Sequence, residues 1–585
     1  MKLFCLTVAL WAVTVRGTSR FTRAEDVLDL IILHNNDMHG RFEETESNTG
    51  TCQTANRNRT CIGGMARTAH VIREFRKQAT EGTGPSVLFL NAGDSFVGTA
   101  WFSVFTWNIT SEFINLLEPD AISLGNHEFD LSVSTLATFL EHLNTPVIAA
   151  NLNFSLVPSL QDKVKSSIVL DVSGQKIGII GYLTPETIQI SNTGDVIFED
   201  EITALNREAA LLESQGINII IALGHSGYVT DQKIAREVSL VDLVIGGHTN
   251  TFLWNGDQPS TETVEDPYPK VITQSSGKKV PVVQAYAYTK YLGVLNCSFD
   301  SNGELVTFAG QPILMESSIP QEQDFLDLLE IYRPAIDALN SEIIGYTRVF
   351  LKGDTTCRRQ ECNLGNLITD ALVAYALSES LEKWTNAPIG IQNGGGIRND
   401  IMPLEGTGAI TRGDLLAVLP FGNQIVVLTM TGSNLLLAIE QMVRSNGETS
   451  LGEFPQVSGL KLTLNMSKPS YSRVVSLKAR CGICDIPTYE EVDPAKNYSV
   501  VTLSFLATGG DGVTVFKNNI SESKTMDLLD VDVVANYITK YSPVYPELQG
   551  RIQFVESKDV DNGQSKTAVC YWLSLLVAIV IFTLT

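Results

Sequence analysis

The sequence is poor in basic residues and in histidine. Its 585 residues include 42 Lys and Arg against 65 Asp and Glu, so the formal net charge is −23, and only seven residues are His. Nucleic-acid binding draws on a basic surface that displaces counterions from phosphates, and this charge balance excludes it. An acidic surface also repels a small phosphate-bearing molecule at long range. Any phosphate site must therefore be a local pocket of metal ions or arginines.

Long apolar runs are scarce and lie near the two ends of the sequence. Residues 3–15 are mostly apolar, follow Lys2 and precede Gly17, which predicts a secretory signal peptide over residues 1–17. Residues 568–585 are nearly all apolar and follow a small, polar segment. This pattern predicts a glycosylphosphatidylinositol (GPI) anchor signal over residues 563–585, with attachment at Asn562. The alternative is a single membrane helix, for which this length is marginal and a basic flank is missing.

Cysteine is also sparse: the sequence has nine, and Cys5 and Cys570 fall in the segments predicted to be removed. In an oxidising compartment, close pairs predict short-loop disulfides, here Cys52 with Cys61, Cys357 with Cys362, and Cys481 with Cys484. The last pair could instead be half of a zinc site or a redox motif, although there is no second C-x-x-C. Cys297 is left over. Secretion agrees with seven N-glycosylation sequons, at Asn58, Asn108, Asn153, Asn296, Asn465, Asn497 and Asn519.

The length of the chain predicts two domains besides the processed ends. In the first, over residues 25–319, the short apolar runs at 28–33, 87–90 and 219–223 end in polar residues or glycine. Such runs are typical of strands buried on both faces of an α/β fold, and the residues after them emerge together at one edge of the sheet. Residues 320–341 predict an amphipathic linker helix. Residues 342–557 predict a second domain with strand-like runs at 417–419 and 500–505.

Five short motifs follow predicted strands of the first domain and contain four of the seven histidines. They are Asp37-Met38-His39, Gly93-Asp94, Gly125-Asn126-His127-Glu128, Gly224-His225 and Gly246-Gly247-His248-Thr249-Asn250. Each alone is an ordinary turn or helix cap. Together they offer the carboxylate, imidazole and amide ligands of a site for two divalent cations. We expect Asp94 to bridge the cations, Asp37 and His39 to chelate one of them, and Asn126, His225 and His248 to complete the other.

Motifs of the second domain combine arginine, glycine and phenylalanine. Arg358 lies between Cys357 and Cys362, and Arg398 ends a glycine run that begins after Asn393. Guanidinium groups bind phosphate and ribose oxygens in a bidentate manner, and glycine lets a backbone approach a ligand. The glycine run is equally consistent with a flexible turn. Two phenylalanines beside small residues, Phe421 and Phe505, would suit stacking on a base, although most phenylalanines at strand ends belong to a core.

The order of these motifs resembles the calcineurin-like metallophosphoesterase superfamily and, over nearly the whole mature chain, the animal members of the 5′-nucleotidase family. The resemblance implies an α/β fold with an N-terminal four-layer α/β/β/α metallophosphoesterase sandwich and a C-terminal α/β nucleoside-binding domain. It implies two divalent metal ions, usually zinc, with Asn250 as a further ligand of the cation that Asp37 and His39 chelate, and a catalytic dyad of His127 and Asp130. It also implies substrate contacts: Phe421 and Phe505 with the base, Asn393 with the base edge, Asp511 with the ribose hydroxyls, and Arg358 and Arg398 with sugar and phosphate.

The function implied by this resemblance is extracellular hydrolysis of nucleoside 5′-monophosphates, AMP above all, by a metal-activated water. The family's members also imply a homodimer formed through the second domain, and the predicted anchor would hold it on the outer face of the cell membrane. One departure is that vertebrate members have a further disulfide in the second domain, whereas this chain has only the unpaired Cys297. Two alternatives remain: an apyrase of the same family that acts on ATP and ADP, and a non-catalytic nucleotide-binding protein. The predicted anchor favours the monophosphatase, and the intact ligand set disfavours the binding protein.

Overall fold

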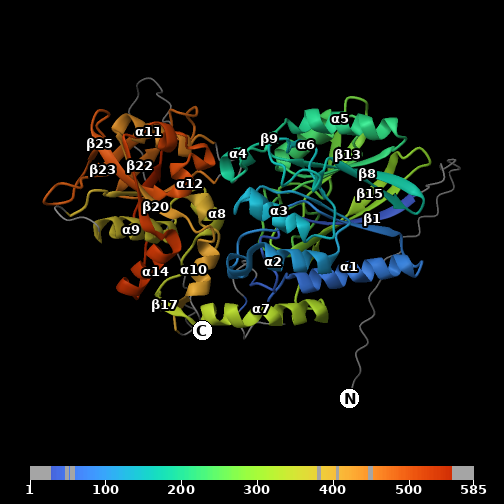
Figure 1. Ribbon diagram of the computed structural model, residues 1–585, viewed down its shortest axis with the longest axis horizontal. Helices are drawn as coiled ribbons and strands as arrows, with labels where there is room; N and C mark the ends of the chain where they lie inside the picture. Colours follow the sequence, from blue (N-terminus) through green and yellow to red (C-terminus); the bar gives the residue numbers. More distant parts are fainter. Residues whose placement is uncertain are drawn as a thin grey trace, which may run out of the picture.

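The computed structural model of the chain describes residues 28–46, 52, 59–378, 384–402, 407–445 and 452–555. It has two lobes, one built from the first part of the chain and one from the last (Figure 1). Helix α7 (Gln323–Ser341) runs along the first lobe and leads into the second (Figure 1). Its buried residues Phe325, Leu329 and Ile336 pack on the helices of the first lobe.

Two sheets make up the first lobe. The larger has the order β15-β14-β1-β2-β3-β4-β6, with β16 paired to β14, and the smaller has the order β12-β13-β11-β10-β8-β7. Strands β1 to β4 are parallel neighbours, as are β8, β10, β11 and β13. The strands are β1 Leu28–Asn35, β2 Ser86–Asn91, β3 Ala121–Ser123, β4 Val147–Ile148, β6 Val164–Lys165, β7 Ser167–Val172, β8 Gln175–Leu183, β10 Ile219–His225, β11 Leu243–Ile245, β12 Lys270–Thr273, β13 Lys279–Val283, β14 Tyr291–Phe299, β15 Leu305–Gly310 and β16 Ile313–Leu314.

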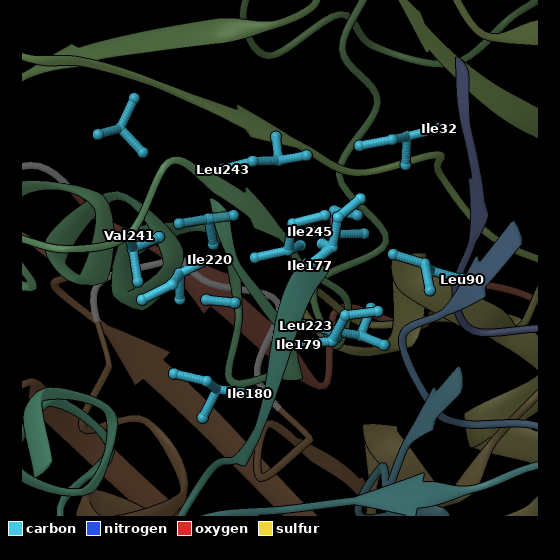
Figure 2. Close-up of a cluster of buried hydrophobic side chains, with 14 of the residues drawn as sticks. Ile32, Leu90, Ile177, Ile179, Ile180, Ile220, Leu223, Val241, Leu243 and Ile245 are labelled. Carbon is cyan, nitrogen blue, oxygen red and sulfur yellow. The ribbon is translucent and has the colours of Figure 1, made fainter. Parts of the chain in front are cut away.

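Successive residues of β1 enter different cores, which explains its apolar run from Leu30 to Leu33. Leu30 and Ile32 lie in the core between the sheets, where side chains of β2, β8, β10 and β11 meet them (Figure 2). Ile31 and Leu33 point to the opposite face and pack with residues of the outer helices. Because both faces are buried, a strand in this position needs apolar residues at every step.

Helices cover both outer faces of the paired sheets. The larger sheet carries α1 (Met65–Thr80), α2 (Ala100–Leu117) and α3 (Val133–Glu141), and the smaller carries α5 (Glu201–Ser214) and α6 (Tyr228–Glu237). A short pair, β5 (Leu152–Asn153) with β9 (Ile197–Phe198), and the single turn α4 (Thr187–Ile190) lie in the connections. This is the predicted four-layer α/β/β/α sandwich, and the α/β fold class is confirmed.

The second lobe contains a five-stranded sheet, β21-β18-β25-β20-β26, a four-stranded sheet, β24-β23-β22-β27, and the pair β17-β19. Helices α9, α11 and α14 pack on these sheets around two apolar cores. The elements are β17 Ile343–Tyr346, α8 Asp354–Cys357, α9 Asn363–Ser378, β18 Ile389–Asn393, β19 Ala409–Thr411, α10 Arg412–Val418, β20 Gln424–Thr431, α11 Gly432–Met442, β21 Pro455–Ser458, β22 Leu460–Leu464, β23 Val474–Arg480, β24 Tyr489–Glu491, β25 Asn497–Leu503, α12 Ser504–Ala507, α13 Val515–Asn518, β26 Glu522–Leu529, α14 Asp530–Tyr541 and β27 Ile552–Phe554.

One predicted strand of the second lobe is wrong. Residues 417–419 end helix α10, which begins with a capping box: the Thr411 side chain accepts a hydrogen bond from the Asp414 backbone N–H, and the Asp414 carboxylate accepts one from the Thr411 backbone N–H. This reciprocal pairing satisfies the first free backbone donors of a helix. The predicted strand at 500–505 is β25, but it ends at Leu503, so that Phe505 lies in the single turn α12.

The three predicted disulfides, Cys52–Cys61, Cys357–Cys362 and Cys481–Cys484, are present, and Cys297 is a buried free cysteine. Asn58 and Asn562 lie outside the described residues. Among the other sequons, Asn465 is buried, so we expect no glycan there, whereas the remaining side chains are exposed: Asn108, Asn153, Asn296, Asn497 and Asn519. No helix in the described ranges is both long and apolar enough to cross a membrane.

Candidate active site

The five motifs of the first lobe meet at one edge of its two sheets. Asp37 and His39 follow β1, Asp94 follows β2, His225 ends β10, and the remaining motif residues follow β3 and β11. The carboxyl ends of parallel strands converge there, which is where ligands bind in α/β sheets. Several of these residues adopt a left-handed backbone that costs energy for any residue but glycine: Asp37, His39, Asp94, His248 and Asn250, with φ between 48° and 80°.

Two groups of side chains are close enough to share cations. The ligand atoms of Asp94, His225 and His248 lie within 4.8 Å of one another, and so do those of His39, Asp94 and His127. Asp94 belongs to both groups, as a bridging ligand must. Its Oδ2 is 2.9 Å from His225 Nε2 and 3.8 Å from His39 Nε2.

Asp37, Asn126 and Asn250 lie next to these groups and could add further ligands. Asp37 Oδ1 is 3.8 Å from the Nε2 atoms of both His39 and His225. Asn126 Oδ1 is 2.9 Å from His248 Nδ1. Asp37 Oδ1 and Asn250 Oδ1 are buried without a hydrogen-bond partner, and such atoms are costly unless something else binds them. The orphaned oxygens and the mix of carboxylate, imidazole and amide donors fit two divalent cations.

Backbone carbonyls orient the histidines. His39 Nδ1 lies 3.1 Å from the carbonyl of Phe96, and His225 Nδ1 lies 2.6 Å from that of Ala92, so each ring directs Nε2 toward Asp94. Burial lowers the pKa of His248 to about 3 and holds the pKa of His39 well below its usual range. Neutral imidazole is the form that binds a metal.

The predicted dyad is in contact. His127 Nδ1 is 2.5 Å from Asp130 Oδ2, and the other carboxylate oxygen of Asp130 accepts a hydrogen bond from the Ser191 hydroxyl at 2.6 Å. Burial alone would lower the pKa of His127, but the charges of Asp130 and Asp94 outweigh it and raise the pKa. Asp130 therefore fixes the Nδ1 proton, and Nε2 is the end that can meet a substrate.

Residues of the second lobe reach this centre. Arg398 Nη2 is 3.5 Å from Nε2 of both His39 and His127. The ring of Phe421 stacks on His127 with centroids 6.1 Å apart, and the Arg398 guanidinium lies 5.8 Å from the Phe421 ring. Arg358 Nε is buried without a partner. The Arg398 guanidinium thus lies beside the candidate metal ligands, and the charge of Arg358 is close enough to act on His248. Both groups are in a position to hold an anion.

A second group of predicted residues lies farther into the second lobe. Asn393, at the end of β18, donates a hydrogen bond from its amide to Asp511 at 2.7 Å. Burial raises the pKa of Asp511 to about 6. Phe505 packs so closely on Gly510 that a Cβ there would lie 2.6 Å from its ring, which explains the glycine. The glycine run after Asn393 is a short 3₁₀ turn, in which Gly394 packs on the Cys357 carbonyl rather than forming a loose loop.

Glu128 and Arg41 are residues of the site that received no role from the sequence. Glu128 is buried, and its carboxylate accepts hydrogen bonds from the backbone N–H groups of Asp94, Ser95, Phe96 and Gly125. Burial raises the pKa of Glu128, and these donors oppose that shift. Its place in the motif after His127 was the available signal.

Arg41 is the other such residue. Its Nη1 donates to the His39 carbonyl at 2.8 Å, and its guanidinium lies 4.4 Å from the ring of Tyr288. Its position two residues after His39 was the only signal in the sequence.

Comparison with known proteins agrees with both lobes. Residues 30–252 match the family described as calcineurin-like phosphoesterase, and residues 343–518 match the 5′-nucleotidase C-terminal domain. The chain is 44% identical over 533 residues to Protein 5NUC of Lutzomyia longipalpis, with 90% of this chain and 92% of that protein covered. It is 40% identical over 560 residues to the 5′-nucleotidase of Mus musculus, with 95% of each covered.

A solved structure gives the same result. The 5′-nucleotidase precursor of Thermus thermophilus is similar with a TM-score of 0.81 and 34% identity, over 90% of this chain and 99% of that one. Both lobes are therefore shared, and so is their arrangement in one chain. On this identity and coverage, the chain belongs to the 5′-nucleotidase family and is a metal-dependent phosphoric monoester hydrolase.

Proposed function

We propose that this protein hydrolyses nucleoside 5′-monophosphates, AMP above all, to the nucleoside and phosphate. The observation that carries the proposal is the contact of Arg398 and Phe421, from the second lobe, with His39 and His127 of the metal-ligand cluster. A phosphate held by the cluster would lie against a guanidinium, and its nucleoside would extend toward Asn393 and Asp511. In this layout, the phosphate that is removed is the one attached to the sugar.

Bound cations would neutralise the phosphate and lower the pKa of a water held between them, which makes it a nucleophile near neutral pH. Around them, Arg398 and Arg358 bind the phosphate oxygens as bidentate donors. His127, with its raised pKa, holds a proton on Nε2 and gives it to the sugar oxygen that leaves. Asp130 accepts the Nδ1 hydrogen and keeps the ring in that orientation.

The nucleoside end is bound by the second lobe. Asp511, ionised above pH 6 or so, accepts the ribose hydroxyls, and Asn393 hydrogen-bonds the base. Phe421 and Phe505 supply aromatic faces on which a base stacks; such stacking contributes about 1–3 kcal/mol per base in nucleic-acid complexes.

We assign the cations as zinc, because imidazole, carboxylate and amide ligands on one dinuclear site suit it. Metal analysis of the purified protein tests that assignment.

We also propose that the mature protein is an extracellular, GPI-anchored homodimer. The anchor rests on the sequence pattern before residue 585, and the extracellular site on the sequons and disulfides. Exposed apolar side chains on and beside the four-stranded sheet of the second lobe would be covered by a second copy: Val475, Ile483, Ile486 and Tyr489. The molar mass in solution, measured by light scattering, tests the dimer.

The substrate is tested by measuring phosphate release from AMP, ADP and ATP side by side. We expect kcat/KM to be highest for AMP, and a preference for ATP and ADP would assign an apyrase instead. Two variants in one disulfide loop sharpen the test. Arg358→Ala should lower kcat/KM for AMP, because Arg358 is half-buried and its charge acts on His248, whereas Arg359→Ala should not, because Arg359 is exposed. Equal losses in the two variants would contradict the assignment of Arg358.

A further inference from the structure

Tyr288 contacts three candidate ligands that we assign to the same cation and not to the other: Asp37, His39 and Asn250. It lies in the loop between β13 and β14, and its backbone N–H donates to the Asp37 carbonyl at 2.8 Å. Its ring centroid is 5.7 Å from that of His39. Its hydroxyl accepts a hydrogen bond from the Asn250 amide nitrogen at 3.3 Å. One residue thus contacts an aspartate through its backbone, and a histidine and an asparagine through its side chain, and these three come from two separate loops.

The contact with Asn250 has a chemical consequence. An asparagine amide has an oxygen end and a nitrogen end of nearly equal size, and only the oxygen can bind a cation. Asn250 Oδ1 is buried and has no hydrogen-bond partner, while the nitrogen end is bound to Tyr288. The hydroxyl therefore gives the nitrogen a partner in the one orientation that leaves the oxygen free for the centre.

The loop is held in a costly conformation to place this side chain. Tyr286, Tyr288 and Thr289 have φ of 57°, 61° and 57°, and each such residue costs about 1–3 kcal/mol. The Arg41 guanidinium lies 4.4 Å from the Tyr288 ring, and Thr289 Oγ1 accepts a hydrogen bond from the Gly64 N–H at 2.8 Å. Strain that the surroundings enforce in this way is concentrated at functional sites.

We propose that Tyr288 is the positioning residue of one of the two cation sites, the one formed by Asp37, His39 and Asn250 with the shared Asp94. Among the contacts of the described residues, Tyr288 makes none with the ligands of the other site, Asn126, His225 and His248. The inference rests on the proposed two-cation function. Partners behind a metal ligand typically change metal affinity by about 10–100-fold when they are removed.

The test is Tyr288→Phe, which removes the hydroxyl and keeps the ring. Zinc binding is measured by equilibrium dialysis against zinc buffers, with phosphate release from AMP measured in the same buffers. We expect wild type to bind two zinc ions. In the variant, one ion should bind about 10–100-fold more weakly and the other as before, and activity should return as free zinc rises. Tyr286→Phe is the matched control, because it removes a hydroxyl from the same loop, and its ring contacts Phe252, Tyr291 and Tyr288 but no candidate ligand.

A double variant tests the same inference without relying on Tyr288→Phe alone. Asn250→Ala should weaken the same single site, and adding Tyr288→Phe to it should have little further effect, because the hydroxyl then has no amide to hold. Two tightly bound ions in Tyr288→Phe, equal weakening of both ions, the same loss in Tyr286→Phe, or additive losses in the double variant would each overturn the inference. If wild type itself binds fewer than two ions, the two-cation function fails and the inference with it. If wild type and Tyr288→Phe both bind two ions tightly, the inference fails but the two-cation function stands.

Discussion

Replacing Glu128 by glutamine should weaken the metal site, although Glu128 is not itself a candidate metal ligand. In the structure, Glu128 Oε1 accepts hydrogen bonds from the backbone N–H groups of Ser95 at 2.7 Å and Phe96 at 3.3 Å. Its Oε2 accepts them from Asp94 at 3.1 Å and Gly125 at 2.7 Å. The carboxylate thus ties the loop that carries the candidate bridging ligand to the motif that carries Asn126 and His127.

The size of the effect follows from the four donors. A glutamine side chain keeps one oxygen and can satisfy one pair of N–H groups, while its NH₂ group faces the other pair. Two buried donors then lose their acceptor, and each costs about 1–3 kcal/mol. We expect Glu128→Gln to lower the free energy of unfolding of the first lobe by about 2–6 kcal/mol. Because Asp94 moves with the loop, bound metal should fall as well.

The assay is urea unfolding together with metal analysis of the folded protein. Glu208→Gln is the matched control, because Glu208 is also buried but accepts one hydrogen bond, from the Ser167 hydroxyl at 2.6 Å. Its amide oxygen can keep that bond, so the cost should stay below about 1 kcal/mol. If Glu128→Gln loses no more stability and no more metal than Glu208→Gln, the reasoning is refuted.

Three other predictions concern the bridge, the ribose contact and the anchor. Asp94→Asn should lower turnover by at least about 100-fold, because both cations lose a shared negative ligand; near-normal steady-state turnover with two metals bound would count against the bridge. Burial raises the pKa of Asp511 to about 6. This carboxyl becomes protonated as the pH falls through that value, so the KM for AMP should rise there, whereas Asp511→Asn should show a high KM without that pH dependence. Phosphatidylinositol-specific phospholipase C should release the activity from cells, with a mature chain ending near Asn562. Activity that stays in the membrane, with peptides from residues 568–585, would indicate a membrane helix instead.

The sequence predicts the first lobe well because its strands are buried on both faces. The run from Leu30 to Leu33 in β1 is apolar throughout, and the structure places Ile31 and Ile32 in two different cores. The second lobe was harder to predict. Residues 417–419 are as apolar as a strand, and the signal that makes them helical lies upstream, in the pairing of Thr411 with Asp414. A short apolar run does not distinguish a strand from the buried end of a helix.

Some residues of the candidate site could likewise be predicted from the sequence, and others could not. Residues that follow strands, such as Asp94 and His225, could be collected from the sequence because strand ends converge, and the structure brings them together. Their roles as ligands stay predictions. Tyr288 and Glu128 could not be assigned, because their importance lies in contacts across long sequence separations: Tyr288 to Asn250, and Glu128 to three successive backbone N–H groups after β2. Neither contact leaves a spacing pattern.

The most direct test of the account is phosphate release from AMP by protein stripped of metal with a chelator and then titrated with zinc. The account predicts that stripped protein is inactive and that activity returns as two equivalents of zinc bind, because no residue of the site supplies a nucleophile without a metal-bound water. AMP hydrolysis that continues unchanged in protein shown to be metal-free would contradict the account.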